Sequence, residues 1–266
     1  MNTIFLRLEG PFQAWGLRAR WGERDTVDAP TKSGLIGLLG CALGLRRENY
    51  ELRQISDALR LGVRVDLPGT RLRDYHTTGG GHYGDVSHRG GTRLHTEAYV
   101  GGVLSAQVTS KGEIKVKINE NTKEPETDVS ERYYLADASF LAVLQGPPDL
   151  VTRLAKALQD PVWPYFLGRK ACVPAEPIFD GVGEYGDLLA ALTAGRFTPR
   201  VEMAWQGRTG RPGALRLLLE VGPGQGNRQY DNIDTPARRV FRPRYVHEVW
   251  LPLGEASSSA INTMEG

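Results

Sequence analysis

The chain has 266 residues, of which 40% are hydrophobic and 24% are charged, and its formal net charge at pH 7 is +2. This composition is typical of an ordinary globular protein with room for one extended domain or two small ones, and it excludes wholesale disorder. So small a net charge also excludes the strong overall field of a very basic nucleic-acid-binding protein.

The first part of the chain has the pattern of a strand, two helices and two more strands. Residues 3–10 alternate as a β-strand does, and the Gly/Pro-bounded loop "GPFQAWG" is expected to expose Gln13 and Trp15. Helices are predicted over residues 33–45 and 48–60, the second from the helical spacing of its leucines and isoleucine. The segments "LGVRVD" and "RLRDYHT" then read as strands.

The first predicted helix contains Gly34, Gly37 and Gly40, although a glycine inside a helix costs about 1 kcal/mol relative to alanine. A stripe of glycines at this spacing would let the helix backbone lie close to a sheet or a ligand while its leucines are buried. Alternatively, free N–H groups and the helix dipole at Lys32 and Ser33 favour an anion. A nucleotide P-loop is disfavoured, because its Lys-Ser/Thr follows the glycines and here these residues precede them.

The middle of the chain changes in character at residue 78. Residues 78–131 are glycine-rich and then polar, and a structureless insert of this length is improbable in a compact domain. A protruding long hairpin is therefore expected, with a segment ordered by a partner as the alternative. After it, the pattern predicts a buried strand over residues 133–144, a helix over 147–160 that begins at a proline pair, and a strand or strand end over 165–174.

These elements predict an α+β fold. A strand-helix-strand unit, a hairpin and a second such unit make a ferredoxin-like or RRM-type N-terminal domain from residues 1–77 and 132–173, with residues 78–131 as a thumb insertion. Residues 174–252 are expected to form a small β-rich C-terminal part with a short helix and alternating strands, and residues 253–266 a disordered tail. The helix is expected at 186–194 and the strands at 214–221 and 239–250.

Cysteine and arginine usage adds two expectations. Cys41 and Cys172 fit no metal-binding spacing, so two buried thiols in a reducing compartment, no zinc and no cofactor are expected. The opening "MNTIFLRLEG" lacks the layout of a signal peptide and no apolar run reaches ~20 residues, which predicts a cytoplasmic protein. Residues 196–250 hold ten arginines, no lysine and five acidic residues, and arginine suits forked phosphate contacts and base stacking.

Five segments together resemble one family. They are "LRLEGPFQAWG", "PTKSGLIGLLGCALG", "LRDYHT", "YLADASFLAVL" and "PYFLGRKAC", and they span residues 4–172 in the family's order. The set is similar to the Cas5 family in its type I-E subtype (Cas5e, also called CasD), a subunit of the CRISPR surveillance complex Cascade. Agreement over the C-terminal part is weaker, and the thumb segment is longer than in the shorter members.

The resemblance implies an RRM-like fold whose hairpin thumb helps to hold the 5′ handle of the CRISPR RNA (crRNA). It also implies a subunit that caps the Cas7 backbone and contacts the large Cas8e (Cse1) subunit, with Cse2 and Cas6e in the same complex. Contact with target DNA would be indirect, and no membrane is involved. Type I-E members are thought to be non-catalytic, because Cas6e cuts the precursor RNA, so the expected role is RNA anchoring in antiviral defence.

An RNA end needs phosphate donors, flat side chains for unstacked bases and a few polar groups. The residues expected to supply these contacts are Gln13, Trp15, Lys32, Ser33, Arg73, Tyr75, His76, Arg169 and Lys170. Within the thumb, the residues that could enclose RNA or wedge against a neighbouring subunit are His82, Tyr83, His88, Arg89, Arg93 and His95.

Other chemistries stay open at this stage. Tyr75 and His76 with Lys32 or Lys170 could serve metal-free RNA cleavage, as in the related type I-C subunits, although no spacing fixes a catalytic set. A scaffold without RNA contact is a third class. Metal chemistry is disfavoured, because the thumb histidines lack the clustered spacing of a zinc site, and no G-x-S-x-G elbow points to a hydrolase.

Overall fold

The computed structural model describes residues 1–16, 22–78, 106–108, 114–116, 128–207, 210–238 and 240–253. Two compact units divide the chain. The first comprises Met1–Arg18, Asp25–Leu72 and Tyr133–Gly266, and the second comprises Ala19–Arg24 and Arg73–Arg132. Within the described ranges, no helix is long and apolar enough to cross a membrane.

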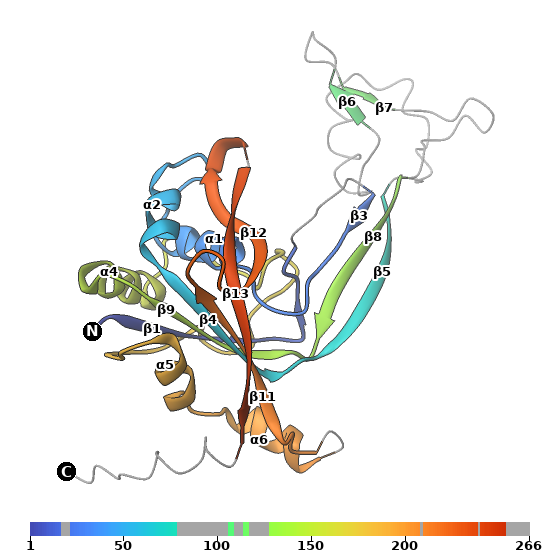
Figure 1. Cartoon of the computed structure of the whole chain (residues 1–266). Coiled ribbons are helices and arrows are strands. Elements are labelled where there is room, and N and C mark those ends of the chain that lie inside the picture. The colour runs from blue at the N-terminus through green and yellow to red at the C-terminus, as the bar shows by residue number, and fades with distance from the viewer. Residues whose placement is uncertain are drawn as a thin grey trace. The chain divides into compact units, whose positions relative to one another are not determined.

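A seven-stranded sheet forms the centre of the first unit, in the order β10-β1-β9-β4-β11-β13-β12 (Figure 1). All neighbouring strands in it are antiparallel. The strands are β1 (Thr3–Glu9), β4 (Arg60–Leu67), β9 (Ser139–Gln145), β10 (Phe179–Gly183), β11 (Ala214–Val221), β12 (Asn227–Thr235) and β13 (Val240–Pro252). The strands after Pro174 thus extend the same sheet as the strands before it.

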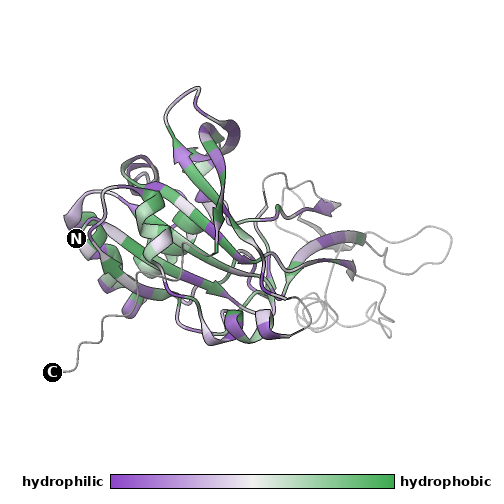
Figure 2. Ribbon diagram, turned by 60° about the horizontal axis from the view of Figure 1, so that its bottom comes forward, coloured by the Kyte–Doolittle hydropathy of each residue, from purple (hydrophilic) through white to green (hydrophobic). Residues whose placement is uncertain are grey.

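Helices cover both faces of this sheet. On one face lie α1 (Lys32–Ala42), α2 (Glu51–Ala58) and α4 (Pro148–Gln159), and on the other α5 (Leu188–Ala194) and α6 (Pro199–Gln206). The alternation of β1 sends Leu6 and Leu8 to the first face and Phe5 to the second, so the whole strand is buried. Figure 2 shows hydrophobic residues along these strands and the helices packed on them.

The first half of the sheet alternates strands and helices, and its last strand, β10, lies after the predicted strand at residues 165–174. In chain order, β1, α1, β4, β9, α4 and β10 form a β-α-β-β-α-β succession, and their strands lie in the order β10-β1-β9-β4. A 3-10 helix, η2 (Pro236–Arg238), joins the long strands β12 and β13.

A second, smaller sheet is built around β8 (Asp128–Ala136). Its other strands are β2 (Phe12–Gln13), β3 (Glu23–Arg24) and β5 (Thr70–Thr78). Of the predicted thumb, residues 78–131, the structure describes Thr78, the paired strands β6 (Ala106–Val108) and β7 (Ile114–Val116), and the start of β8. The predicted tail from residue 254 on lies outside the described residues.

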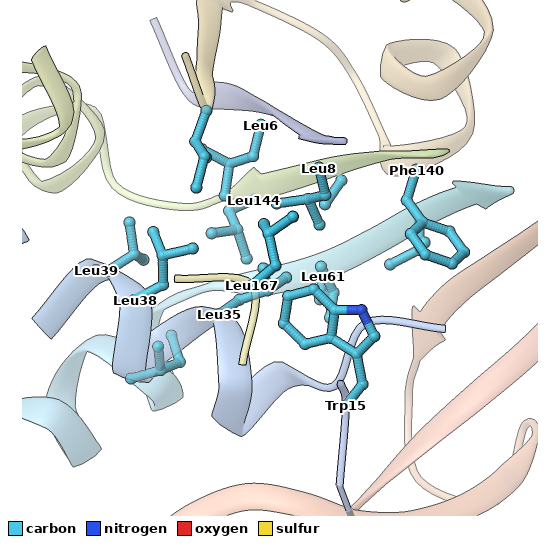
Figure 3. Packing of buried hydrophobic residues seen from close by; sticks show 14 of the residues in the cluster. Leu6, Leu8, Trp15, Leu35, Leu38, Leu39, Leu61, Phe140, Leu144 and Leu167 are labelled. Atoms are coloured by element: carbon cyan, nitrogen blue, oxygen red, sulfur yellow. The ribbon is translucent and has the colours of Figure 1, made fainter. Parts of the chain in front are cut away.

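The apolar residues of α1 enter the core as expected, but its glycines do not face the sheet. Figure 3 shows Leu35, Leu38 and Leu39 among the core side chains. A Cβ on Gly34 would lie 2.9 Å from the Trp15 ring, and one on Gly40 would lie 2.7 Å from Leu52 of α2. Gly37 is exposed, with no atom within 4 Å of such a Cβ. The prediction of one glycine face laid against the sheet is therefore wrong.

Two strand predictions are also wrong. Residues 133–144 are not one strand, because the chain turns between β8 and β9 at Asp137, which has a positive φ of 58°. Residues 165–174 form a loop instead of a strand. It is closed by backbone hydrogen bonds from Leu167 N to Cys172 O and from Cys172 N to Arg169 O, each 2.8 Å long, and Leu167 fills the core (Figure 3).

Candidate nucleic-acid interface

The N-terminus of α1, a predicted phosphate site, already holds an anion from the protein itself. The backbone N–H of Lys32 donates to Asp231 Oδ2 at 2.8 Å, and the Thr31 hydroxyl caps the helix by accepting from Gly34 N at 3.3 Å. Asp231 comes from β12 and is fully buried. Because its carboxylate satisfies the positive end of the helix, an RNA phosphate is not needed there.

The Lys32 side chain is likewise committed to an internal contact. It is 1% exposed, and its Nζ lies 2.8 Å from Glu220 Oε1 on β11. Burial lowers the pKa of Lys32, and the nearby Glu220 opposes that shift. Arg244 joins this group through Asp231, with Nε 2.6 Å from Oδ1. The prediction that Lys32 contacts RNA phosphate is therefore wrong for this structure, where the lysine ties α1 to the strands of the C-terminal part.

Gln13 and Trp15, both expected in an exposed loop, are buried. Gln13 Nε2 donates to the carbonyl oxygens of Leu8 and Ala138, both at 2.9 Å. Trp15 is 1% exposed, and its Nε1 donates to Gln13 Oε1 at 3.1 Å. Since both polar groups are satisfied inside the protein, the prediction that these residues present themselves to RNA bases is wrong.

The loop that carries Arg169 and Lys170 is held in place by backbone contacts on one side and presents Lys170 to solvent. Gly168 has a φ of 97°, and a Cβ there would lie 1.8 Å from Ala14 O, so only glycine fits. The Arg169 guanidinium donates to Tyr133 O at 2.9 Å and to Asp25 O at 3.3 Å. Arg169 is half-buried and binds the protein's own carbonyl groups, whereas the next residue, Lys170, is exposed.

The predicted residues of β5 belong to the second unit. Tyr75 is 63% exposed, and Arg73 forms an ion pair with Glu131. His76 lies in β5, but its side chain is outside the described set, as are all the thumb residues His82, Tyr83, His88, Arg89, Arg93 and His95. In the first unit, Ser33 is half-buried on the first turn of α1. Lys170, Tyr75 and Arg73 are thus the predicted contacts with well exposed side chains, although Arg73 is already paired with Glu131.

Several of the arginines described in the C-terminal part are neutralised within the fold. Four of them form ion pairs: Arg200 with Asp137, Arg216 with Asp28 and Glu248, Arg242 with Asp57 and Asp234, and Arg244 with Asp231. Sequence reasoning could not identify Asp28 and Asp57 as partners, because each lies more than 170 residues from its arginine in the chain. Arg228 differs, because it is exposed and its guanidinium lies over the ring of Tyr245.

The described side chains include no group of three His, Cys, Asp or Glu residues placed to hold a metal ion. In the first unit, Lys170 is exposed on its loop. In the second unit, Tyr75 and Arg73 are exposed on β5. Cations and aromatic rings of this kind suit a nucleic-acid backbone and its bases.

Comparison with known proteins identifies the family. The model for the family described as CRISPR-associated protein (Cas_Cas5) matches residues 3–249. The CRISPR system Cascade subunit CasD of Escherichia coli (strain K12) is 33% identical over 203 residues, which cover 72% of this chain and 75% of that protein. A solved structure described as a crystal structure of Cas protein is 30% identical with a TM-score of 0.59, covering 95% of this chain and 96% of the other.

A chain from a CRISPR RNA-guided surveillance complex also matches. It is 29% identical with a TM-score of 0.61, over 94% of this chain and 90% of that one. Sequence and structure agree over nearly the whole length, including the C-terminal strands where the motif resemblance was weaker. The chain therefore belongs to the Cas5 family of CRISPR-associated proteins, as its five motifs predicted.

Proposed function

We propose that this protein is a non-catalytic, crRNA-binding subunit of a type I-E Cascade complex. It anchors the 5′ handle of the RNA, caps the Cas7 backbone and contacts the large Cas8e (Cse1) subunit. The observation that carries the proposal is the 33% identity to a protein named as a Cascade subunit, over three quarters of its length. The match to a chain of an RNA-guided surveillance complex over 94% of this chain supports it.

The topology supports the domain roles within this proposal. The β-α-β-β-α-β succession and its strand order are those of an RRM-type domain. The long strands β5 and β8 lead toward residues 79–127, where the resemblance places the thumb. In this proposal the first unit is the palm that receives the handle, and the thumb locks the first spacer nucleotides against the adjacent Cas7.

The exposed residues define revised handle contacts. Lys170 supplies a phosphate contact, and Arg169 holds its loop in place through the carbonyl groups of Tyr133 and Asp25. Tyr75 supplies a ring for an unstacked base, with Arg73 two residues before it on the same strand. These contacts replace the buried Gln13, Trp15 and Lys32 in the predicted set.

Handle binding is tested with a matched pair of lysine variants. Fluorescence anisotropy with labelled handle RNA is measured for Lys170→Ala. The control is Lys156→Ala, which removes an exposed lysine of α4. Loss of one phosphate contact should reduce the slope of log affinity against log salt by about 0.7 for single-stranded RNA. We expect this reduction for Lys170→Ala alone. A wild-type slope in that variant would show that Lys170 is not a handle contact.

The runner-up function is metal-free cleavage of precursor crRNA by Tyr75, His76 and Lys170. Purified protein is incubated with labelled repeat RNA in the presence of a chelator, and the products are separated by size. We expect no discrete product. A single handle-releasing cut that disappears in His76→Ala would replace the non-catalytic proposal with the endoribonuclease.

A third candidate function, a scaffold that does not contact RNA, is tested by whether the complex assembles without the 5′ handle. The Cascade subunits are co-expressed with a crRNA that lacks its 5′ handle, and this protein is recovered by affinity purification. Handle anchoring predicts that the yield of complex containing this subunit falls sharply. An undiminished yield would favour a subunit held by protein contacts alone.

A further inference from the structure

The β12–β13 hairpin carries a cluster of aromatic and cationic side chains on one face. Arg228 of β12 stands opposite Tyr245 of β13 in the strand register, and its guanidinium carbon lies 5.9 Å from the centre of the tyrosine ring. Tyr230, which is 56% exposed, also interacts with Arg228. His247, two residues beyond Tyr245, is exposed as well. We refer to Arg228, Tyr230, Tyr245 and His247 as the hairpin face.

The carboxylates of this region are separated from the hairpin face by strand alternation. Val246 of β13 is buried against α1 and α2, and Glu220 of β11 stands opposite it in the register, so both point to that side. Glu248, two residues further along β13, follows the same side and pairs with Arg216. Asp231 is turned inward to Arg244 and the start of α1. These three carboxylates thus pair with cations on the side of the sheet that packs against α1 and α2, opposite the hairpin face.

Among the described residues, no carboxylate compensates the charge of Arg228. In the described part of the chain it interacts with the two tyrosines and with no carboxylate. The Tyr50–Arg53 pair of α2 provides the contrast, since its guanidinium carbon lies 5.6 Å from the ring centre in a similar arrangement. Arg53, however, also pairs with Asp57 at 3.6 Å and with Asp234 at 3.4 Å. The two pairs have the same chemistry but differ in whether an anion is already present.

Single-stranded nucleic acids are bound by exposed aromatic rings, on which bases stack, and by nearby cations that meet the phosphates. We propose that the hairpin face binds single-stranded nucleic acid, with bases stacking on Tyr230 and Tyr245 and Arg228 contacting a phosphate. A protein partner is the less suitable occupant, because the hairpin face consists of two tyrosine rings, a guanidinium and an imidazole, which suit bases and phosphates. This site is additional to the handle contacts and does not depend on them.

Photo-cross-linking locates the contact directly. The full-length protein is irradiated with an oligouridine that contains 4-thiouridine and, separately, with an oligothymidine that contains 4-thiothymidine. The cross-linked peptides are identified by mass spectrometry. Cross-links within residues 227–235 or 240–252 are expected, and the oligonucleotide that gives them distinguishes RNA from DNA as the source. Cross-links confined to other parts of the chain would overturn the proposal.

Affinity measurements test the chemistry with matched variants. Arg228→Gln and Tyr230→Leu should each weaken binding of the same oligonucleotides about fivefold or more, and Arg228→Gln should also reduce the salt slope by about 0.7. The controls Arg53→Gln and Tyr50→Leu change the neutralised pair and should leave binding unaltered. All four positions are at or near the surface, so circular dichroism should show a native fold in each variant.

The outcomes separate this site from the handle contacts. Hairpin cross-links that persist in Lys170→Ala show an independent site, even if the handle assignment proves wrong. Wild-type oligonucleotide affinity in both hairpin variants would refute the proposed site. Equal losses of affinity in the two control variants would refute it as well. Hairpin variants that bind oligonucleotides normally but no longer join the complex would mark a protein-docking face, which also overturns the proposal.

Discussion

Gly34 and Gly37 of α1 should respond in opposite ways to the same substitution by alanine. Alanine at an exposed helix position gains about 1 kcal/mol over glycine. At Gly37 nothing lies within 4 Å of the added Cβ, so Gly37→Ala should stabilise the chain by about that amount. At Gly34 the same gain is opposed, because the Cβ would lie 2.9 and 3.1 Å from two atoms of the buried Trp15 ring.

The Trp15 ring has little freedom to move away from Gly34, because it is enclosed by the core and its N–H is bonded to Gln13. Overpacking of such a site costs about 2–3 kcal/mol, which leaves Gly34→Ala destabilised by about 1–2 kcal/mol after the helix gain. Differential scanning calorimetry should place the two variants on opposite sides of the wild-type Tm, at about 2–4 °C for each kcal/mol. If Gly37→Ala lowers Tm as much as Gly34→Ala, local packing does not explain these glycines.

Three further predictions follow from the backbone and from buried groups. Gly168→Ala should lower the free energy of unfolding in urea by about 4 kcal/mol, because it combines a φ of 97° with a clash against the backbone of Ala14. Gly181→Ala has a φ of 129° but open space around the added Cβ, so it should cost less than half as much. Burial lowers the pKa of Lys32, so the unfolded chain holds this proton more tightly and the lysine's contribution to stability grows as pH rises toward 10.5. The Tm difference between wild type and Lys32→Met should therefore shift in favour of the wild type over that range, and a constant difference would contradict this. Burial also raises the pKa of both thiols, and Cys172 is the more deeply buried, so mass spectrometry should find Cys41 alkylated first in the native protein; equal rates would contradict the burial.

Elements with a strong local signal could be predicted from the sequence. The helix α4 begins at its proline pair, and its apolar residues recur at helical spacing, so the predicted and observed bounds agree within two residues. The strands β1 and β4 were also predicted close to their observed bounds. Three elements of the C-terminal part, β10, α6 and β12, were missed. The start of α6 does carry a signal, because Thr198 caps it and Pro199 occupies the first turn.

The break between β8 and β9 had no such signal. The segment "LADAS" contains no glycine or proline, and the turn depends on Asp137 in a left-handed conformation, which aspartate tolerates better than most residues. The loop at residues 165–174 was misread for a related reason. Its apolar residues resemble a strand, but Leu167 is buried by a turn that the chain closes on itself.

Errors at the candidate site came from contacts between distant parts of the chain. Lys32 resembles a phosphate ligand because it begins a glycine-rich helix, and only the fold reveals that Glu220, 188 residues further on, already binds it. Trp15 resembles a surface ring because glycine and proline flank its loop. Its N–H is bonded to Gln13, however, and Gln13 is itself bonded to the carbonyl group of Ala138, 125 residues further on. In both cases the residue type was suited to binding and its exposure was not predictable.

The arginines of the C-terminal part show which property matters for binding. Their excess over acidic residues in sequence suggested a basic surface, but ion pairs with Asp28, Asp57 and Asp231 use much of that charge to hold strands and helices together. A cation contributes to nucleic-acid affinity by releasing counterions from phosphate, which requires a charge that is exposed and free of a carboxylate. Arg228 meets both conditions among the described residues, and the alternation of strands β11 to β13 explains why, since it places the carboxylates of this region on the opposite face.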